Sequence, residues 1–352
     1  MIAHRALSDG GQRPVDVAGW VAEFVGAART SVDLALYDLN LAGESEALVR
    51  GALEGAAARG VAVRLAYNVD HPNPIPVPPP PECVPEDVEA LSVPTRAVSG
   101  IPDLMHHKFC VRDGKAVWTG STNWTDDSWS RQENVIVTVE SAELAEAYAL
   151  AFEQLWSGRQ VEDTGQVEPR RVDVDGVLVR PWFCPGYGDA LSHRVAKAIG
   201  KARRRVRICS PVITAAPVLG TLAQVASEGR VDLAGCVDAT QVADVFRQWE
   251  LEQVSAWKIP LLQSVLSKAP FSGKNSTPWA PGSLHDYMHA KVTVADDIVF
   301  CGSFNLSRSG ERNAEDMLEL HDAGLAGELA AYVDAVRERY PAVSLPEHAV
   351  SR

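Results

Sequence analysis

The sequence predicts an α/β protein built from two similar halves, and three observations support this. Strand-like and helix-like runs alternate along the chain, a pattern of His, Lys, Ser and Asn occurs at 106–123 and again at 289–305, and the runs around both copies follow one order. Such alternation is typical of mostly parallel sheets covered by helices. We expect the halves at 1–165 and 170–352, with the polar stretch 157–169 as the seam.

The first half contains clear periodic segments. Apolar residues at helical spacing predict a helix over about 17–28, and alternation predicts a strand at 31–37. A second helix, about 44–58, ends near Gly60 and precedes a strand at 61–67. A strand at 134–139 and a helix at 142–155 close this half.

The second half repeats the order. A helix from about Asp189 leads into a strand at 206–209, and a helix near 218–227 ends at Gly229 before a strand at 231–237. A strand at 317–320 and a helix at 323–339 close the chain.

Two insertions interrupt the repeat. Residues 71–85 are rich in proline, which predicts a stiff, extended surface loop rather than a helix or central strand; a partner-binding segment is the alternative. Residues 246–281 contain several tryptophans and other large apolar residues. This second insertion either packs against the core or forms a lip beside the second copy of the motif.

Composition narrows the class of protein. The 352 residues are 46% hydrophobic and carry a formal charge of −13, typical of a soluble globular protein and unlike a general nucleic-acid binder. No signal peptide or bilayer-length apolar run is visible, so we expect a cytoplasmic protein without stable membrane insertion. The six cysteines show no metal-binding or disulfide spacing, which favours reduced, mostly buried thiols.

The repeated motif carries the candidate chemistry. Its first copy comprises His106, Lys108, Asp113, Gly120, Ser121, Asn123 and Glu133. Its second copy comprises His289, Lys291, Asp296, Gly302, Ser303, Asn305 and Glu315. Histidine and lysine two residues apart on a strand point to the same face, so each copy offers an imidazole and an ammonium to one ligand.

Two such half-sites suit phosphodiester chemistry. The lysines, with the Ser and Asn donors, can neutralise charge on phosphate oxygens. One neutral histidine can attack phosphorus, and the other, protonated, can give its proton to the leaving oxygen. A glutamate bound to each imidazole would fix its tautomer, with Glu133 and Glu315 as candidates. This arrangement requires no metal and no cofactor.

The motif resembles the signature of the phospholipase D superfamily, which is HxK, four residues, Asp, six residues and GSxN. The first copy fits throughout, whereas the second has five residues between Asp296 and Gly302. The resemblance covers most of the chain. It implies a bilobed fold with pseudo-twofold symmetry and an active site at the junction of the halves.

The resemblance also implies residue roles. His106 is expected as the nucleophile and His289 as the acid, by analogy with members that carry both motifs in one chain. Asp113 and Asp296 are expected to be structural. Glu133 and Glu315 are expected to support the histidines. With both motifs in one chain, a monomer suffices for activity.

Three functions stay open for the sequence alone. A phospholipid-directed phosphodiesterase or phosphatidyltransferase is favoured by the apolar 246–281 insertion and the acidic total charge. A DNA or RNA nuclease of the same superfamily is the alternative. A silent scaffold is the third, although both motifs are intact.

Three other features have plainer interpretations. His107 points away from His106 and is expected to pack. His285 and His289 are expected to enter a strand, which argues against a zinc pair. The basic run 201–207 is expected to be a solvated helix end rather than a phosphate patch.

Overall fold

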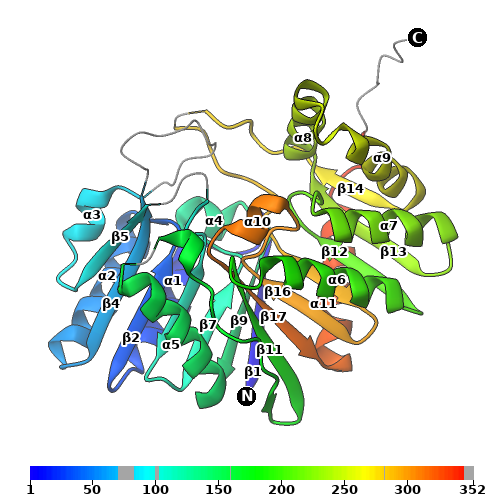
Figure 1. Ribbon diagram of the computed structural model, residues 1–352. Coiled ribbons are helices and arrows are strands. Elements are labelled where there is room, and N and C mark those ends of the chain that lie inside the picture. The colour runs from blue at the N-terminus through cyan, green and yellow to red at the C-terminus, as the bar shows by residue number, and fades with distance from the viewer. Residues whose placement is uncertain (70–82, 100–102, 159, 281, 345–352) are drawn as a thin grey trace.

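The computed structural model describes residues 1–69, 83–99, 103–158, 160–280 and 282–344. Two sheets stand side by side, each covered by helices (Figure 1). The predicted α/β architecture with two similar halves is confirmed. Most of the proline-rich segment 71–85 lies outside the described residues.

The first sheet has the strand order β1-β9-β7-β6-β2-β4-β5. The strands are β1 (Ile2–Leu7), β2 (Ser31–Leu36), β4 (Ala62–Val69), β5 (Thr95–Ser99), β6 (Lys108–Arg112), β7 (Ala116–Gly120) and β9 (Asn134–Glu140). Strands β2, β4 and β5 pair in parallel, and the other pairs are antiparallel. Five of the seven strands, β1, β2, β4, β5 and β7, therefore point the same way.

The second sheet has the order β10-β11-β17-β16-β15-β12-β13-β14. The strands are β10 (Val172–Val174), β11 (Val177–Cys184), β12 (Arg205–Cys209), β13 (Asp232–Asp238), β14 (Phe271–Lys274), β15 (Val292–Ala295), β16 (Ile298–Gly302) and β17 (Glu315–His321). Here β12, β13 and β14 are the parallel neighbours, and β11 and β16 share their direction. The topology around the motif hairpin thus repeats that of the first sheet.

Helices cover both sheets. The outer face of the first sheet packs on α1 (Pro14–Gly26) and α2 (Gly43–Ala58), and that of the second on α6 (Gly188–Lys201) and α7 (Ala216–Glu228). Helices α5 (Ala142–Trp156) and α11 (Ala323–Arg339) join residues of both sheets in one shared apolar core. That shared core fixes the two halves against each other, which the composite site requires.

The two motif hairpins differ by one residue at the turn. Three residues, 113–115, separate β6 from β7, whereas Asp296 and Asp297 alone separate β15 from β16. The turns begin with a residue at positive φ, 56° for Asp113 and 54° for Asp296. The five-residue spacing before Gly302 is therefore a shorter turn on the same hairpin.

The 246–281 insertion is mostly helical. It contains the end of α8 (Ala239–Glu252), a 3₁₀ turn (Ala256–Lys258), α9 (Ile259–Lys268) and β14. Phe246, Trp249, Leu262 and Phe271 join the core of the second half, while Trp257 and Trp279 remain exposed. Most of its large apolar residues therefore pack inward. Among the described residues, no helix is long and apolar enough to cross a membrane.

Candidate active site

Both motif histidines lie just before their strands and are tied to the opposite half. Met105 forms an isolated parallel bridge with Ala314, and Met288 forms one with Glu133. The backbone N–H of His106 donates to the carbonyl of Ala314 (2.8 Å), and that of His289 to the carbonyl of Glu133 (3.2 Å). The strands thus begin later than the sequence predicts, because the chain first pairs across the junction.

This crossing brings the two imidazoles together. The ring centroids of His106 and His289 are 6.5 Å apart with an interplanar angle of 78°, and both side chains are largely buried. The ring of Tyr37 contacts the His106 ring edge-on at 4.7 Å. The space between the imidazoles suits one phosphoryl group.

The two motif lysines are arranged alike. Lys108 Nζ donates to the carbonyl of His106, and Lys291 Nζ to the carbonyl of His289, each at 2.7 Å. Both lysines are almost fully buried. Two ammonium groups therefore stand beside the histidines in a low-dielectric setting, where charge interactions are strong.

The supports of the two histidines differ. His106 Nδ1 lies 2.9 Å from Oε2 of Glu315, one of the two glutamates expected to support a histidine, whereas His289 Nδ1 lies 3.2 Å from Asn134 Oδ1. Asn134 Nδ2 donates to the carbonyl of Ser128 (3.2 Å), so its oxygen faces the imidazole. Each Nδ1 therefore carries the proton, which leaves each Nε2 available for substrate.

The sequence predicts that Glu133 supports one of the histidines, but among the described residues its side chain contacts neither imidazole. Its carboxylate instead accepts hydrogen bonds from Lys274 Nζ (3.0 Å), the backbone N–H of Asp9 (3.3 Å) and the hydroxyl of Tyr340. Met105 and Met288 hold equivalent positions in the two motif copies, so their bridge partners Ala314 and Glu133 are also equivalent. One residue further on, Glu315 is therefore the counterpart of Asn134. The first half has one residue more between its short helix α4 (Asp126–Ser130) and β9 than the second has between α10 (Arg308–Arg312) and β17.

The motif serines and glycines pack against the supporting strands. Ser121 Oγ donates to Asn134 Oδ1 (2.7 Å) and accepts from the N–H of Val135, and Ser303 Oγ accepts from the N–H of Asp316 (2.9 Å). A Cβ at Gly120 would lie 2.1 Å from the carbonyl oxygen of Val135, and Gly302 is as tightly enclosed. Both serines are fully buried in the structure, and their predicted contact with phosphate stays a prediction.

The motif asparagines each leave a side-chain atom available to a ligand. Asn123 Nδ2 donates to Asp38 Oδ2 (3.2 Å). The side-chain oxygens of Asn123 and Asn305 are buried without a hydrogen-bond partner among the described residues. Either amide can turn a donor or an acceptor towards a ligand, which suits a phosphate oxygen or a leaving group.

The motif aspartates cap the start of neighbouring strands. Asp113 accepts from the backbone N–H groups of Arg29, Thr30 and Ser31, and Asp296 accepts from those of 203–205. Burial opposes ionisation of Asp113, but these donors lower its pKa to about 2. Both aspartates hold the far ends of the motif hairpins.

The site holds an excess of basic groups. Burial lowers the pKa of both histidines well below the usual value, and the neighbouring lysines lower it further. Burial also lowers the pKa of Lys108 to about 8 and that of Lys291 well below its usual range. Burial raises the pKa of Glu315 and of Asp38 to about 7. A bound anion would favour the charged forms of the histidines and lysines, and would disfavour ionisation of the two carboxyls.

Sequence reasoning missed several residues beside the site. Asp38, Tyr37, Asn134 and Lys274 lie outside the repeated pattern. The packing of β2 beside β6 brings in Asp38 and Tyr37, and the pairing of the halves brings in Asn134 and Lys274. Asp316 is also buried there: it lies 3.2 Å from His107 Nδ1 and accepts from Thr119 and Tyr148. His107 accordingly packs away from the site.

His285 lies near the site but in a different setting. Its ring stacks on Tyr287, with 5.3 Å between the centroids. Within the described part of the chain, no group of three or more His, Cys, Asp or Glu side chains is placed to hold a metal ion.

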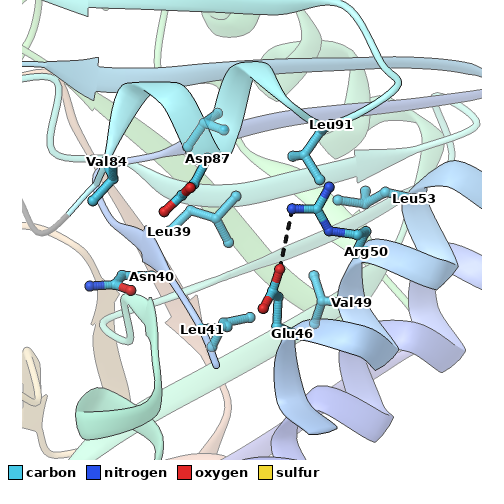
Figure 2. A pocket seen from close by; sticks show the side chains of 11 residues that line it. Leu39, Asn40, Leu41, Glu46, Val49, Arg50, Leu53, Val84, Asp87 and Leu91 are labelled. Carbon is cyan, nitrogen blue, oxygen red and sulfur yellow. Dashed lines mark hydrogen bonds and ion pairs between the residues drawn. The ribbon is translucent and has the colours of Figure 1, made fainter. Parts of the chain in front are cut away.

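A cavity of about 160 Å³ with both apolar and polar lining residues opens in the first half (Figure 2). It lies between α2, the short strand β3 (Leu39–Asn40) and the short helix α3 (Pro85–Glu89). Leu39, directly after Asp38, lines it together with Leu41 and Leu53, and the Arg50–Glu46 ion pair (3.2 Å) stands at its side.

These features define a two-lobed α/β protein with one histidine–lysine site built by both lobes. The family model described as "Cardiolipin synthase, PLD-like domain" matches residues 21–156 and 195–337. The chain therefore belongs to the phospholipase D superfamily of phosphodiesterases.

Individual relatives match parts of the chain. Phospholipase D of Rickettsia bellii is 28% identical over 155 residues, covering 43% of this chain and 67% of that protein. Mitochondrial cardiolipin hydrolase of Xenopus laevis is 47% identical over 53 residues, covering 15% of this chain and a quarter (25%) of that protein. The phosphatidylserine synthase structure from Haemophilus influenzae shares the fold, with TM-score 0.65 and 11% identity over 96% of this chain and 86% of that one.

Proposed function

We propose that the protein is a phospholipid-directed phosphodiesterase that works through a phosphohistidine on His106. The observation that carries the proposal is the pair of buried imidazoles, 6.5 Å apart, flanked by two buried lysines. Four basic groups enclose a space that suits a phosphate anion. Fixed cations around a phosphoryl group stabilise the charge of its transition state.

The first step makes a covalent intermediate. His106 Nε2 attacks phosphorus while Nδ1 donates to Glu315, which stabilises the positive charge that develops on the ring. The nitrogen–phosphorus bond forms, the bond to the leaving oxygen breaks, and His289 gives its proton to that oxygen. His289 is neutral in the empty site, because burial and the neighbouring lysines lower its pKa. The negative charge of the bound substrate favours the imidazolium, so His289 takes up a proton from solvent as the substrate binds.

The second step reverses the proton transfer. His289 Nε2 removes a proton from water or an alcohol, the new oxygen–phosphorus bond forms, and His106 leaves. Hydrolysis and transfer differ only in which acceptor enters. No metal ion is needed in either step.

The cavity beside Asp38 favours a lipid substrate. Its leucines and valines offer apolar surface of the kind that binds hydrocarbon, next to the charged groups of Glu46, Arg50 and Asp87. The family description and the two relatives, which are named for cardiolipin and for phospholipase D activity, support the same substrate class.

Intact-protein mass after a brief incubation tests the proposal. Phospholipid vesicles, single-stranded DNA and bis-p-nitrophenyl phosphate are each offered to the wild type, His106→Ala and His289→Ala, with the exposed His193→Ala as matched control. We expect an adduct stable in base and labile in acid on all but His106→Ala. It should accumulate on His289→Ala with bis-p-nitrophenyl phosphate, because p-nitrophenolate leaves without an acid while the base for the second step is missing.

The size of the adduct identifies the substrate class, since a phosphatidyl group and a nucleotide differ in mass. An adduct that survives in His106→Ala and vanishes in His289→Ala would reverse the two roles. An adduct with DNA alone would make the protein a nuclease. No adduct and no turnover with any substrate would overturn the proposal.

A further inference from the structure

A basic groove lies on the second half, away from the histidine pair. It is formed by α6, β11 and the β15–β16 turn, encloses about 560 Å³, and is called the α6 groove below. Its lining includes five basic residues, Arg171, Arg180, Arg194, Lys197 and Lys201. Its floor includes Asp296, five residues beyond Lys291. At about 3.3 Å per strand residue, β15 separates the two places by roughly 16 Å.

Most of the positive charge in the α6 groove is uncompensated. Within the described residues, the side chains of Arg171, Lys197 and Lys201 make no hydrogen bond and no ion pair. Arg180 Nε is buried and also lacks an acceptor there. Burial and the nearby charges of Arg171 and Arg194 lower the pKa of Arg180, although Glu319 opposes them.

The acidic groups nearby are already engaged. Glu319 accepts from Arg194 (2.5 and 3.0 Å), from Trp182 (3.1 Å) and from His321 (2.7 Å), and lies only 3.7 Å from Arg180. Asp296 caps the backbone of 203–205, and Asp297 pairs with Arg204 (2.5 Å). One shared carboxylate therefore orients Arg194 and Arg180 without neutralising the groove.

The repeated architecture does not account for this charge. Helix α1 occupies in the first half the place that α6 occupies in the second, and α1 contains no Lys or Arg. On α6, Arg194, Lys197 and Lys201 are three and four residues apart, so they share one face. A concave cluster of like charges in a protein of net charge −13 is costly unless an anion completes it.

We propose that the α6 groove is a second binding site, for a compact anion with two or more phosphate groups. Four basic side chains without full partners exceed the charge of one phosphate, and the guanidinium of Arg180, held in place by Glu319, is suited to bidentate phosphate contact. Such phosphates occur on lipid headgroups and as free solutes, and the groove chemistry is the same for both.

Titration calorimetry tests the site with inorganic tripolyphosphate at an ionic strength of about 0.1 M, where exposed charges beyond about 10 Å are screened. The groove variant is Arg171→Gln/Lys197→Gln/Lys201→Gln. The control variant, Arg230→Gln/Arg247→Gln/Lys268→Gln, removes the same charge from exposed positions outside the groove. All six side chains are at the surface, so both variants should melt like the wild type.

We expect the groove variant to bind tripolyphosphate at least tenfold more weakly than the wild type and the control variant. A second arm uses vesicles with and without a phosphatidylinositol bisphosphate, whose headgroup carries more than one phosphate, and tighter binding there than to tripolyphosphate assigns the site to a lipid headgroup. Equal binding by the groove and control variants, or no binding by the wild type in either arm, would overturn the proposal.

Discussion

The two halves build the same motif but support its histidines differently. The second half lends His106 the carboxylate of Glu315, while the first half lends His289 the amide of Asn134. A hydrogen bond to an ionised acceptor is about twice as strong as a neutral one and favours a cationic ring. The difference suits a nucleophile on one side and a readily deprotonated acid on the other, which is the assignment proposed above.

The same comparison explains the misplaced glutamate. Glu133 lies one residue before Asn134, so the alternation of the chain turns it away from His289 and towards Lys274. A lysine of the second half thus neutralises Glu133 across the junction, whereas Glu315 of the second half supports a histidine in the site. A repeat in sequence can therefore hide an asymmetry in chemistry.

Changing Glu315 or Asn134, the residues that accept the hydrogen bonds of the two histidines, should produce the largest effect on kcat. Glu315→Gln removes the charge that stabilises the developing imidazolium of His106, and we expect kcat to fall by roughly 100-fold, equivalent to about two pKa units of lost interaction. Asn134→Asp raises the pKa of His289 and weakens it as an acid, for a loss of roughly tenfold. Steady-state kinetics with bis-p-nitrophenyl phosphate measures both.

Both variants need a folding control, because Asn134 also donates to Ser128. Their melting temperatures should be compared with that of the wild type. If Glu315→Gln is as active as the wild type while Asn134→Asp is inactive, the assignment of nucleophile and acid is reversed.

The pH dependence of kcat/KM sharpens the comparison. Burial raises the pKa of Glu315 to about 7, so activity should rise as pH increases through 7 and this carboxylate ionises. Burial lowers the pKa of Lys108 to about 8, so activity should fall above 8 as its ammonium loses charge. The plot of kcat/KM against pH should therefore be a narrow bell, because kcat/KM reports the ionisation of groups in the free enzyme.

Glu315→Gln provides the control for this profile. The acidic limb should flatten in the variant while the basic limb stays in place. An unchanged acidic limb would assign it to another group, such as Asp38, whose pKa burial also raises to about 7.

The smallest effect on chemistry is expected from Lys274→Met. The change leaves Glu133 buried without its cation, which should cost about 3–5 kcal/mol of unfolding free energy. Turnover per folded molecule should change little, because neither residue touches the imidazoles. Urea denaturation measures the loss, and Glu133→Gln/Lys274→Met should recover most of it. A large loss of turnover with unchanged stability would contradict this separation.

Local signals in the sequence predict much of the fold. The closing helix is expected at 323–339 and found at Ala323–Arg339, because its apolar residues keep one period and Asp322 caps its first turn. Strand β11 is not predicted, since Pro181 argues against a paired strand. Strand β1 at the chain start also lacks a clear signal, and its pairing with β9 is a long-range contact.

The site is predicted in part. The repeated pattern identifies His106, His289 and both lysines as neighbours of one ligand, because duplicated half-sites need each other. It cannot identify Asn134, since one extra residue after a short helix decides which side chain faces His289. Nor can it identify Asp38 or Tyr37, which only the packing of β2 beside β6 brings to the site.

The backbone bridges that Met105 and Met288 each form with the opposite half have a mechanical consequence. Each histidine takes its backbone hydrogen bond from the opposite half, so the halves interlock around the reaction centre. Any hinge that separated them would break these bonds and pull the histidines out of place together. Turnover must therefore proceed in a rigid frame, with substrate entering and product leaving over its surface rather than through an opening clamp.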